Sequence, residues 1–356
     1  MKKIVILGST GYIGRQTLDI VRAYPNEFKV IGLTANKNKE LLEKQRQEFK
    51  PQVIGLGEGE LEKIAVLKEA DLIIVAVVGL AGLKPTLAAI KAKKNIALAT
   101  KEVMVVAGEL VMKEAKKNKV KIIPIDSEHS AIFQCLRAGK NSEVKKIVLT
   151  MGKGKFATMS NSDLEKITLK DIYKNPTWRM GEKITVDSAT CLNKSFEVVE
   201  ARWLFDLPVE KINIIVHPEY LCHSMVEYSD GSIIAEIGTA DMKRYTQHAL
   251  FYPQRKMAKV TSFTDLINKK MSFEKAPYKK FPGLRLGFKA LKAGGTMPAV
   301  LHGADDTAVR KFIKGEIKFT EIAQLIENTM DKHQVIVNPN LEQILMAEKW
   351  GRENVN

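Results

Sequence analysis

The sequence predicts an α/β protein with more than one domain, on three observations. Residues 1–125 alternate short β-branched runs with stretches of helical length, which is typical of βαβ units around a parallel sheet. From Val144 the pattern changes to β-rich patches around a polar stretch, and from Leu286 helical periodicity dominates. With 356 residues, 45% of them hydrophobic, the chain is long enough for two or three cores.

The first predicted domain spans residues 1–150. Six short runs rich in β-branched residues are expected to form its parallel strands, since helical stretches separate them. These runs are Lys3–Leu7, Lys29–Leu33, Gln52–Leu56, Leu72–Val77, Asn95–Ala99 and Val120–Ile125.

Residues 151–265 are predicted to form a second domain. Further strands are expected at Lys145–Leu149, Lys211–Val216 and Ser232–Ile237. Between them, residues 151–185 are polar and punctuated by proline and glycine, so we expect loops with one short helix that act as a mobile lid. A linker at 266–285 and a helical domain at 286–356 complete the predicted organisation.

Composition excludes several classes of function. The net charge is +15, but the lysines are spread over amphipathic stretches such as Val111–Lys121, so we expect solvated faces and no nucleic-acid partner. A positive field favours phosphorylated substrates and a phosphate-bearing cofactor. The longest apolar run, Leu72–Leu83, is too short for a membrane span, and three scattered cysteines favour a reducing, cytoplasmic location.

A glycine-rich loop follows the first predicted strand. Gly8, Gly11 and Gly14 precede a helical pattern at Arg15–Tyr24. Glycines let the backbone approach a pyrophosphate, and the helix N-terminus supplies amide donors. The spacing is GxxGxxG rather than GxGxxG, so a plain strand-to-helix turn stays an alternative.

The second predicted strand ends without an acid. An NAD-selective enzyme would place Asp or Glu there against the ribose hydroxyls, whereas this chain has Thr34–Asn38 with Lys37. A lysine suits a 2′-phosphate, so we favour NADP over NAD. A surface loop with an incidental lysine is the alternative.

Asp126 and Glu128 stand one residue apart at the end of an apolar run. In a strand, alternate side chains share a face, so both carboxylates would point into the cleft beyond the strand. Such a pair suits metal binding or proton transfer. The alternative is a solvated strand end in which Asp126 or Ser127 caps a helix at Glu128–Leu136.

A second polar group lies at Asp187–Glu200. If the chain is helical from Thr190, Asn193, Glu197 and Glu200 share one face. That face could complete the metal site begun by the two acids above, and three carboxylates suit Mg²⁺ or Mn²⁺. An ordinary amphipathic helix with a solvated face is the alternative.

Other side chains carry weaker signals. Lys101 follows a predicted strand and would lie at the carboxyl edge of the sheet, where ligands bind. His217 and His223 lie in a β-rich patch and are more typical of hydrogen-bonded core residues than of catalysts. Trp178 and Met180, in the expected lid, would cover a ligand or staple the loop to the domain beneath.

Taken together, these motifs resemble the 1-deoxy-D-xylulose 5-phosphate reductoisomerase family of the non-mevalonate isoprenoid pathway. The similar strings run in order through about residues 1–330. They are GSTGYIG (Gly8–Gly14), TKE with VVAGEL (Thr100–Leu110), PIDSEHSAIFQCL (Pro124–Leu136), NPTWRMGEKITVDSATCLNKSFEVVEA (Asn175–Ala201), HSMVEYSDGS (His223–Ser232), DM (Asp241–Met242) and FPGLRLGFKALKAGGTMPAVL (Phe281–Leu301).

The resemblance implies an α/β fold in three parts and a two-stage reaction. The parts are an N-terminal Rossmann-like NADPH domain, an α/β catalytic domain with a metal site and flexible loop, and a C-terminal helical domain, usually in a homodimer. The implied reaction rearranges 1-deoxy-D-xylulose 5-phosphate by retro-aldol and aldol steps. Hydride from NADPH then gives 2-C-methyl-D-erythritol 4-phosphate.

The same resemblance implies roles for individual residues. The implied catalytic residues are Lys101, Glu128 and Lys194, and the implied ligands of Mn²⁺ or Mg²⁺ are Asp126, Glu128 and Glu197. The implied substrate contacts are Lys101, Ser127, Glu128, Gly152, Lys153, Asn175, Trp178, Ser188, Asn193, Lys194 and Glu197. The implied NADPH contacts are Thr10, Gly11, Tyr12, Ile13, Asn36, Lys37, Asn38, Thr100, Glu102 and Gly181.

The chain departs from the family pattern at several positions. Gly152 replaces a phosphate-contacting serine, Asn175 replaces the histidine of the loop motif, and Thr100 replaces an asparagine. Tyr12 replaces a serine, and Tyr220 stands where a serine is frequent. The residues implied to bind the metal and to catalyse the rearrangement are unchanged. This favours the interpretation that the type of reaction is retained over the interpretation that the substrate is retained.

Lys153 or Lys155 could replace the lost serine hydroxyl with a charge. Replacing both by alanine should then raise the KM for the phosphorylated substrate.

Two other interpretations of the protein's function stay open. One is a paralogous NADPH-dependent oxidoreductase or isomerase acting on a different sugar phosphate or polyol acid, and the other is a catalytically idle nucleotide-binding or regulatory protein.

Overall fold

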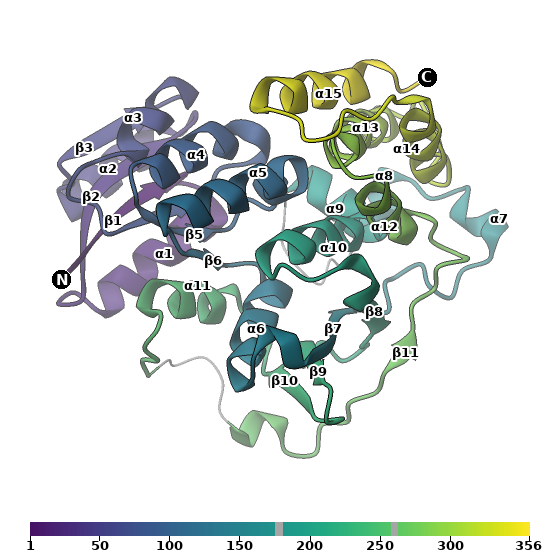
Figure 1. Cartoon of the computed structure of the whole chain (residues 1–356), viewed down its shortest axis with the longest axis horizontal. Coiled ribbons are helices and arrows are strands. Elements are labelled where there is room, and N and C mark those ends of the chain that lie inside the picture. The colour runs from purple at the N-terminus through teal and green to yellow at the C-terminus, as the bar shows by residue number, and fades with distance from the viewer. Residues whose placement is uncertain (175–180, 258–262) are drawn as a thin grey trace. The chain divides into compact units, whose positions relative to one another are not determined.

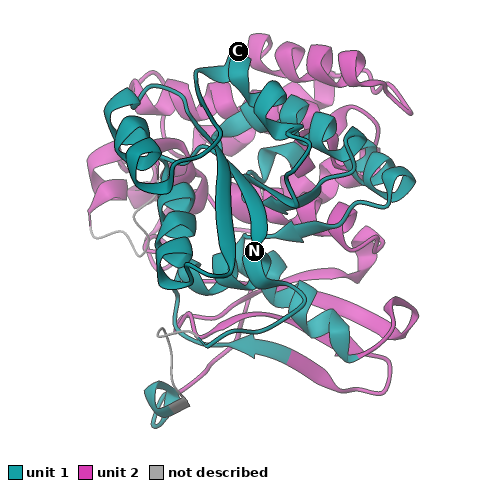
Figure 2. Ribbon diagram, turned by 90° about the vertical axis from the view of Figure 1, so that its left-hand side faces the viewer, with its two compact units in different colours: residues 1–103, 109–138, 235–269 teal, residues 104–108, 139–234, 270–356 magenta. Residues whose placement is uncertain are grey.

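The computed structural model describes residues 1–174, 181–257 and 263–356. The chain forms two compact units, each assembled from separate parts of the sequence (Figure 2). Unit 1 consists of residues 1–103, 109–138 and 235–269, and unit 2 of residues 104–108, 139–234 and 270–356. Each unit therefore combines segments from different predicted domain ranges. The elements carry the labels of Figure 1.

Unit 1 is built on a six-stranded parallel sheet with strand order β3-β2-β1-β4-β5-β6. This is the order of doubly wound dinucleotide-binding sheets, whose ligands bind where the order reverses, between β1 and β4. All six predicted strands are confirmed, with small differences at their ends. They are β1 (Lys2–Leu7), β2 (Phe28–Ala35), β3 (Val53–Leu56), β4 (Leu72–Val75), β5 (Asn95–Leu98) and β6 (Ile122–Pro124).

The strands of unit 1 are apolar without alternation because the sheet is parallel. Helices cover both faces of such a sheet, so successive side chains of one strand are all buried. Ile4, Val5, Ile6 and Leu7 of β1 are each 0% exposed. The helices of unit 1 are α1 (Tyr12–Ala23), α2 (Lys39–Phe49), α3 (Leu61–Ala65), α4 (Leu83–Lys91), α5 (Glu102–Asn118), α6 (Ser127–Cys135) and α11 (Met242–Phe251).

Helix α5 belongs to both units because residues 104–108 are assigned to unit 2. Its backbone leaves helical geometry at Ala107, with φ −135° and ψ 24°. The next residue, Gly108, lies against the indole of Trp203, where a Cβ atom would overlap the ring. A side chain at position 108 would therefore push the helix off Trp203.

Unit 2 is built on a five-stranded mixed sheet with strand order β10-β9-β7-β8-β11. Strand β7 pairs with β8 in parallel and with β9 in antiparallel fashion, and β11 pairs with β8 in antiparallel fashion. The boundary between the units falls within β10, after Ile234. The strands are β7 (Val144–Met151), β8 (Ile212–Val216), β9 (Cys222–Tyr228), β10 (Ile233–Ile237) and β11 (Glu274–Lys275).

Two predictions for this region are wrong. Residues 151–185 were expected to hold one short helix, but α7, α8 and the start of α9 all lie there, and Ser160 and Thr168 cap the first two with their side chains. The range 266–285 is not a plain linker, because β11 adds an edge strand to the sheet and α12 begins at Gly283. Both errors arise because short elements carry little periodicity.

The remaining helices belong to unit 2. Helix α15 begins with a capping box, in which Asn340 and Gln343 accept each other's backbone N–H groups at 2.9 Å. These helices are α7 (Asn161–Leu164), α8 (Leu169–Tyr173), α9 (Glu182–Ala189), α10 (Leu192–Leu204), α12 (Gly283–Ala293), α13 (Met297–Ile313), α14 (Glu321–Lys332) and α15 (Leu341–Glu353). Short 3-10 helices lie at Glu58–Glu60, Gly79–Gly82, Leu136–Ala138, Asn141–Glu143, Val209–Lys211 and Phe263–Leu266.

Across the described ranges, every helix falls short of the length and apolar character that a membrane crossing needs.

Candidate active site

The glycine loop of unit 1 connects β1 to α1 at the point where the strand order reverses. Gly8 has φ +89°, and a Cβ atom there would lie 2.5 Å from the Ala76 carbonyl oxygen after β4. A Cβ atom at Gly14 would overlap the Gly8 carbonyl. Ser9 and Gln45 fix the loop, because the Ser9 hydroxyl donates to Gln45 Oε1 (2.6 Å) and Gln45 Nε2 donates to the Ser9 carbonyl (3.0 Å).

The other residues expected to contact NADPH lie at neighbouring strand ends or in unit 2. Asn36, Lys37 and Asn38 are exposed after β2, and Asn38 caps α2 by accepting from Leu41 N–H at 3.0 Å. Thr100 follows β5 and is buried, with its hydroxyl donating to the Val77 carbonyl at 2.6 Å. Thr10, Gly11, Tyr12 and Ile13 form the α1 entrance, Glu102 begins α5, and Gly181 precedes α9 in unit 2.

The strand geometry predicted for Asp126 and Glu128 is wrong. Strand β6 ends at Pro124, Asp126 is the N-cap residue of α6, and Glu128 lies in its first turn. Helix α6 begins at Ser127, directly after Asp126, so the chain turns into a helix sooner than the apolar run suggested. The two carboxylates still approach each other, with oxygen atoms within 4.8 Å, because they share one turn rather than one strand face.

Asp126 is held ionised by two partners within unit 1. Lys101 Nζ lies 2.9 Å from Asp126 Oδ2, and His129 Nδ1 lies 2.9 Å from Oδ1. Burial on its own would raise the pKa of this carboxyl, but Lys101 and His129 outweigh burial and hold the pKa well below its usual range. These bonds explain why the Asp126 side chain does not cap α6 within the described structure.

Glu128 and Ser127 occupy the first turn of α6, where a helix N-terminus favours negative charge. The Ser127 hydroxyl donates to Glu128 Oε2. Sequence reasoning overlooked His129. The signal was its position three residues after Asp126, a spacing that brings two side chains of a helix start together.

Unit 2 supplies a second buried group on α10. Asn193 Nδ2 donates to Glu197 Oε1 at 2.5 Å, and Lys194 Nζ is paired with Glu197 Oε2. Glu197 is 1% exposed and Lys194 is 5% exposed. Lys194 Nζ also donates to the Thr150 carbonyl (2.6 Å) near the end of β7, so α10 delivers an ammonium group to the carboxyl edge of this sheet.

The helical face predicted from Thr190 is confirmed, but the helix begins two residues later. Helix α9 ends at Ala189 with Thr190 as its C-cap, and Cys191 adopts φ +64° before α10 starts at Leu192. Burial raises the pKa of the Cys191 thiol to about 12, which keeps it protonated at neutral pH and unsuited to nucleophilic work.

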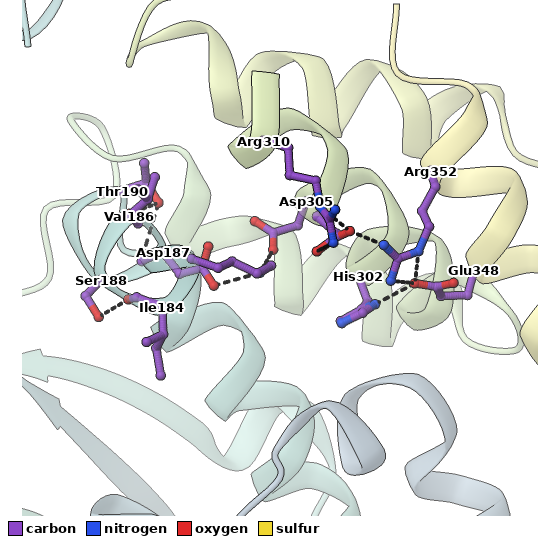
Figure 3. A network of polar contacts seen from close by, with 12 residues as sticks. Ile184, Val186, Asp187, Ser188, Thr190, His302, Asp305, Arg310, Glu348 and Arg352 are labelled. Atoms are coloured by element: carbon purple, nitrogen blue, oxygen red, sulfur yellow. Dashed lines mark hydrogen bonds and ion pairs between the residues drawn. The ribbon is translucent and has the colours of Figure 1, made fainter. Parts of the chain in front are cut away.

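Ser188 lies on α9, which a buried ionic network ties to the C-terminal helices (Figure 3). Lys183 Nζ lies 2.7 Å from Asp187 Oδ2 and is also paired with Asp305 of α13. Burial alone would lower the pKa of Lys183, but Asp187 and Asp305 outweigh it and raise this pKa. Ser188 is exposed and donates to the Ile184 carbonyl at 2.7 Å.

The same network continues between α13 and α15. Glu348 Oε1 lies 2.9 Å from His302 Nδ1 and 2.7 Å from Arg352 Nε, while Arg352 also pairs with Asp306 (Figure 3). Sequence reasoning missed this network, because its members are scattered along the chain. Only Lys183 and Asp187 lie in a motif, and their partners on α13 and α15 do not.

The loop after β7 begins with one of the chain's departures from the family pattern, Gly152. Lys153 Nζ is paired with Glu274 Oε1 at 2.8 Å, and Lys155 Nζ donates to the carbonyls of Asp171 and Lys174. Gly152 follows β7 directly. The expected contacts Asn175, Trp178 and Met180 lie outside the described residues.

His217 is confirmed as a hydrogen-bonded core residue. It is 1% exposed, its Nδ1 atom donates to the Ser272 carbonyl at 2.8 Å, and its Nε2 atom accepts from Leu221 N–H at 3.0 Å. The accepting Nε2 assigns the proton to Nδ1. His223 is buried as well, at 5% exposure.

The doubly wound sheet of unit 1, with Asp126 and Glu128 in the same unit, defines an α/β protein of the dinucleotide-binding class with oxygen ligands for a hard cation. The chain belongs to the 1-deoxy-D-xylulose 5-phosphate reductoisomerase family. Models of that family match residues 4–60 and 54–108, its C-terminal domain model matches 122–205, and a second model, the DXP reductoisomerase C-terminal domain, matches 237–354.

Curated relatives and solved structures agree with this assignment. The reductoisomerase of Caldanaerobacter subterraneus subsp. tengcongensis is 46% identical, covering 100% of this chain and 98% of its own. That of Geotalea uraniireducens is 45% identical, covering 99% and 97%. The Zymomonas mobilis enzyme in complex with NADPH matches with TM-score 0.93 and 35% identity over 99% and 98% of the two chains. A reductoisomerase with NADPH, fosmidomycin and magnesium matches with TM-score 0.90 and 35% identity over 99% and 97%.

Proposed function

We propose that this protein converts 1-deoxy-D-xylulose 5-phosphate to 2-C-methyl-D-erythritol 4-phosphate with NADPH and Mn²⁺ or Mg²⁺. Family membership over the full chain supports the reaction. The observation that carries the proposal is Asp126, a carboxyl only 12% exposed that Lys101 holds ionised beside a second acid, Glu128. A carboxylate kept ionised in this way is suited to binding a cation and not to general acid catalysis.

The divalent cation would be held by Asp126, Glu128 and Glu197. The donor set fits, since all three offer oxygen atoms and lack the thiolates that zinc favours. When bound, the cation would polarise the carbonyl and hydroxyl oxygens of the substrate, and NADPH would supply the hydride. Glu197 is aimed by Asn193 and Lys194, so its carboxylate is fixed before the cation arrives.

Two ammonium groups would balance the negative charge that develops on the substrate. Lys101 and Lys194 are both almost fully buried, where a charge acts more strongly than in water. We assign catalytic roles to these lysines and to Glu128. Ser127, Ser188 and Asn193 would orient the sugar phosphate, together with Gly152, Lys153, Asn175 and Trp178 of the loop.

NADPH would bind at the glycine loop of unit 1. The close approach of Gly8 to Ala76 and of Gly14 to Gly8 leaves backbone amides, rather than side chains, at the entrance of α1. We propose contacts from the entrance of α1, the end of β2 and the start of α5. These residues are Thr10, Gly11, Tyr12, Ile13, Asn36, Lys37, Asn38, Thr100 and Glu102, and Gly181 before α9 is a further proposed contact.

NADPH oxidation at fixed Mn²⁺ with 1-deoxy-D-xylulose 5-phosphate tests this function. We expect turnover by the protein and a loss of at least about 1,000-fold in kcat for Glu197→Gln, because one charged ligand of the cation is lost. Glu210→Gln, an exposed acid of the same unit, is the matched control and should keep full activity. Turnover that survives Glu197→Gln would remove the metal assignment.

A paralogous activity on another sugar phosphate is the second candidate, favoured by Gly152 and Asn175 in place of family residues. Absence of turnover by folded, NADPH-binding protein would support it. We further propose a homodimer in the cytoplasm, on the basis of the family. Light scattering on the purified protein would contradict the dimer if it gave the monomer mass.

A further inference from the structure

Two departures from the family pattern meet in unit 2. Gly152 follows β7, and the side chain of Tyr220 comes from the loop after β8. A Cβ atom added at Gly152 would overlap the hydroxyl oxygen and the ring of Tyr220. The phenol hydroxyl thus occupies the space that a side chain at position 152 would fill.

The loop that carries Tyr220 is fixed in place. Tyr220 has φ +54°, a conformation that bulky residues rarely adopt, and its N–H donates to the His217 carbonyl at 3.3 Å. His217 is bonded to Ser272 and Leu221, and Glu219 accepts from the Ser272 hydroxyl at 2.6 Å. A strained backbone that its surroundings hold in place is a recurring property of functional sites.

The Tyr220 hydroxyl lies at the end of the sheet where ligands are expected. Strands β7 and β8 are parallel, so the loops that follow them leave the same edge. Lys194 reaches this edge as well, through its bond to the Thr150 carbonyl. Lys153 and Lys155 already bind a carboxylate and backbone carbonyls, which weakens the case for either as the replacement for the lost serine.

We propose that the Tyr220 hydroxyl donates a hydrogen bond to the phosphate of the substrate, in place of a side-chain hydroxyl at position 152. Tyr220 is then a specificity-determining residue for the phosphorylated substrate, and Gly152 is required because any larger residue would displace the phenol. This inference rests on the proposed function. His217 and Glu219 act as positioning residues, since their hydrogen bonds hold the loop in place.

Four variants test the proposal. Tyr220→Phe keeps the ring over Gly152 and removes only the hydroxyl, so we expect the KM for 1-deoxy-D-xylulose 5-phosphate to rise about 10-fold with little change in kcat or in the KM for NADPH. Gly152→Ser should raise the same KM, because its side chain collides with Tyr220. The double variant Gly152→Ser with Tyr220→Ser should restore the KM to within about 3-fold of the original. Tyr278→Phe, a half-buried tyrosine of the same unit, is the control and should change nothing.

Calorimetric binding of inorganic phosphate to the NADPH-loaded protein is measured on the same variants. An unchanged phosphate affinity in Tyr220→Phe overturns the proposal, whether or not the sugar phosphate is turned over. Failure of the original protein to oxidise NADPH overturns the proposed function instead, so the two failures are distinguishable. A double variant no better than Gly152→Ser would also contradict the exchange of hydroxyls, because the serine at position 152 would then fail to replace the phenol even with the collision removed.

Discussion

The two units differ in how far apart in sequence their interacting residues lie. In unit 1, Gly8, Gly14 and the residues between them form one continuous loop, whose shape follows from close contacts with neighbouring backbone. In unit 2, Lys194 meets Thr150 across 44 positions, and Lys183 meets Asp305 across 122. A contiguous loop can be recognised as a motif, whereas side chains brought together by folding cannot.

The largest expected effect follows from breaking the ion pair between Lys183 and Asp305, which lie far apart in sequence in unit 2. Asp305→Asn removes a carboxylate that is 0% exposed and leaves Lys183, which is 28% exposed, with Asp187 as its anionic partner. We expect a loss of about 3 kcal/mol in the free energy of unfolding, measured by urea denaturation, because a buried charge-assisted hydrogen bond is lost. Ser188 on α9 would lose its support, so activity should fall at temperatures well below the unfolding midpoint.

Asp331→Asn is the matched control for this change. Asp331 is paired with Lys289 at 2.7 Å but is 59% exposed, so its loss should cost less than about 1 kcal/mol. Equal effects of the two substitutions would show that α9 does not depend on the buried network.

The fold of unit 1 was predictable because its information is local. Consecutive apolar residues such as Ile4–Leu7 mark a strand buried on both faces, and the glycine spacing marks the turn that follows. The error at Asp126 is also local in origin. An N-cap aspartate and a strand-end aspartate have the same neighbours in sequence, and only the observed helix start at Ser127 separates them.

The site in unit 2 was predictable in part. The spacing of Asn193 and Glu197 placed both on one helical face, and their 2.5 Å hydrogen bond confirms it. The roles of Tyr220 and Asp305 could not be predicted, since each depends on a residue far away in sequence. Two unusual residues, Gly152 and Tyr220, were visible as departures, but nothing in the sequence showed that they touch.

The second prediction concerns a substitution in the glycine loop of unit 1, whose residues are close together in sequence. In Gly14→Ala the new Cβ overlaps the Gly8 carbonyl and the Ser9 backbone, so the loop must move away from its binding conformation. We expect the dissociation constant for NADPH to rise about 100-fold, equivalent to about 2.7 kcal/mol, by fluorescence titration. Gly59→Ala is the control, because open space surrounds that Cβ, and its affinity should be unchanged. A normal affinity in Gly14→Ala would argue that the cofactor does not use this loop.

The third prediction concerns His248, a buried titratable group of unit 1. Burial, followed by repulsion from Arg255 and Arg137, lowers the pKa of His248 to about 4. The unfolded chain takes up a proton near pH 6.5 that the folded protein accepts only near pH 4, so stability is constant above pH 6.5 and falls as the pH drops between these values. We expect a loss of about 2 kcal/mol between pH 7 and pH 5 from this group, measured as the change in urea midpoint.

His248→Gln provides the comparison for that loss. Glutamine carries no titrating proton, so the variant should lose about 2 kcal/mol less than the original protein over the same pH interval, even if it is less stable at pH 7. Parallel pH curves for the two proteins would show that His248 is not the source of the pH dependence.

The smallest expected effect concerns two exposed lysines of unit 2, and it contrasts surface charge with contacts between residues that folding brings together. Lys153 is 46% exposed in its pair with Glu274, and Lys155 is an exposed residue bonded to backbone carbonyls. Exposed pairs of this kind contribute little, so replacing both lysines by alanine should raise the KM for the sugar phosphate by less than about 3-fold. Lys145→Ala with Lys170→Ala removes the same charge from exposed positions of unit 2 and controls for long-range attraction. A 10-fold rise confined to the variant of Lys153 and Lys155 would show that these lysines bind the phosphate. The phosphate site of unit 2 would then be formed by residues close together in sequence, as the glycine loop of unit 1 is.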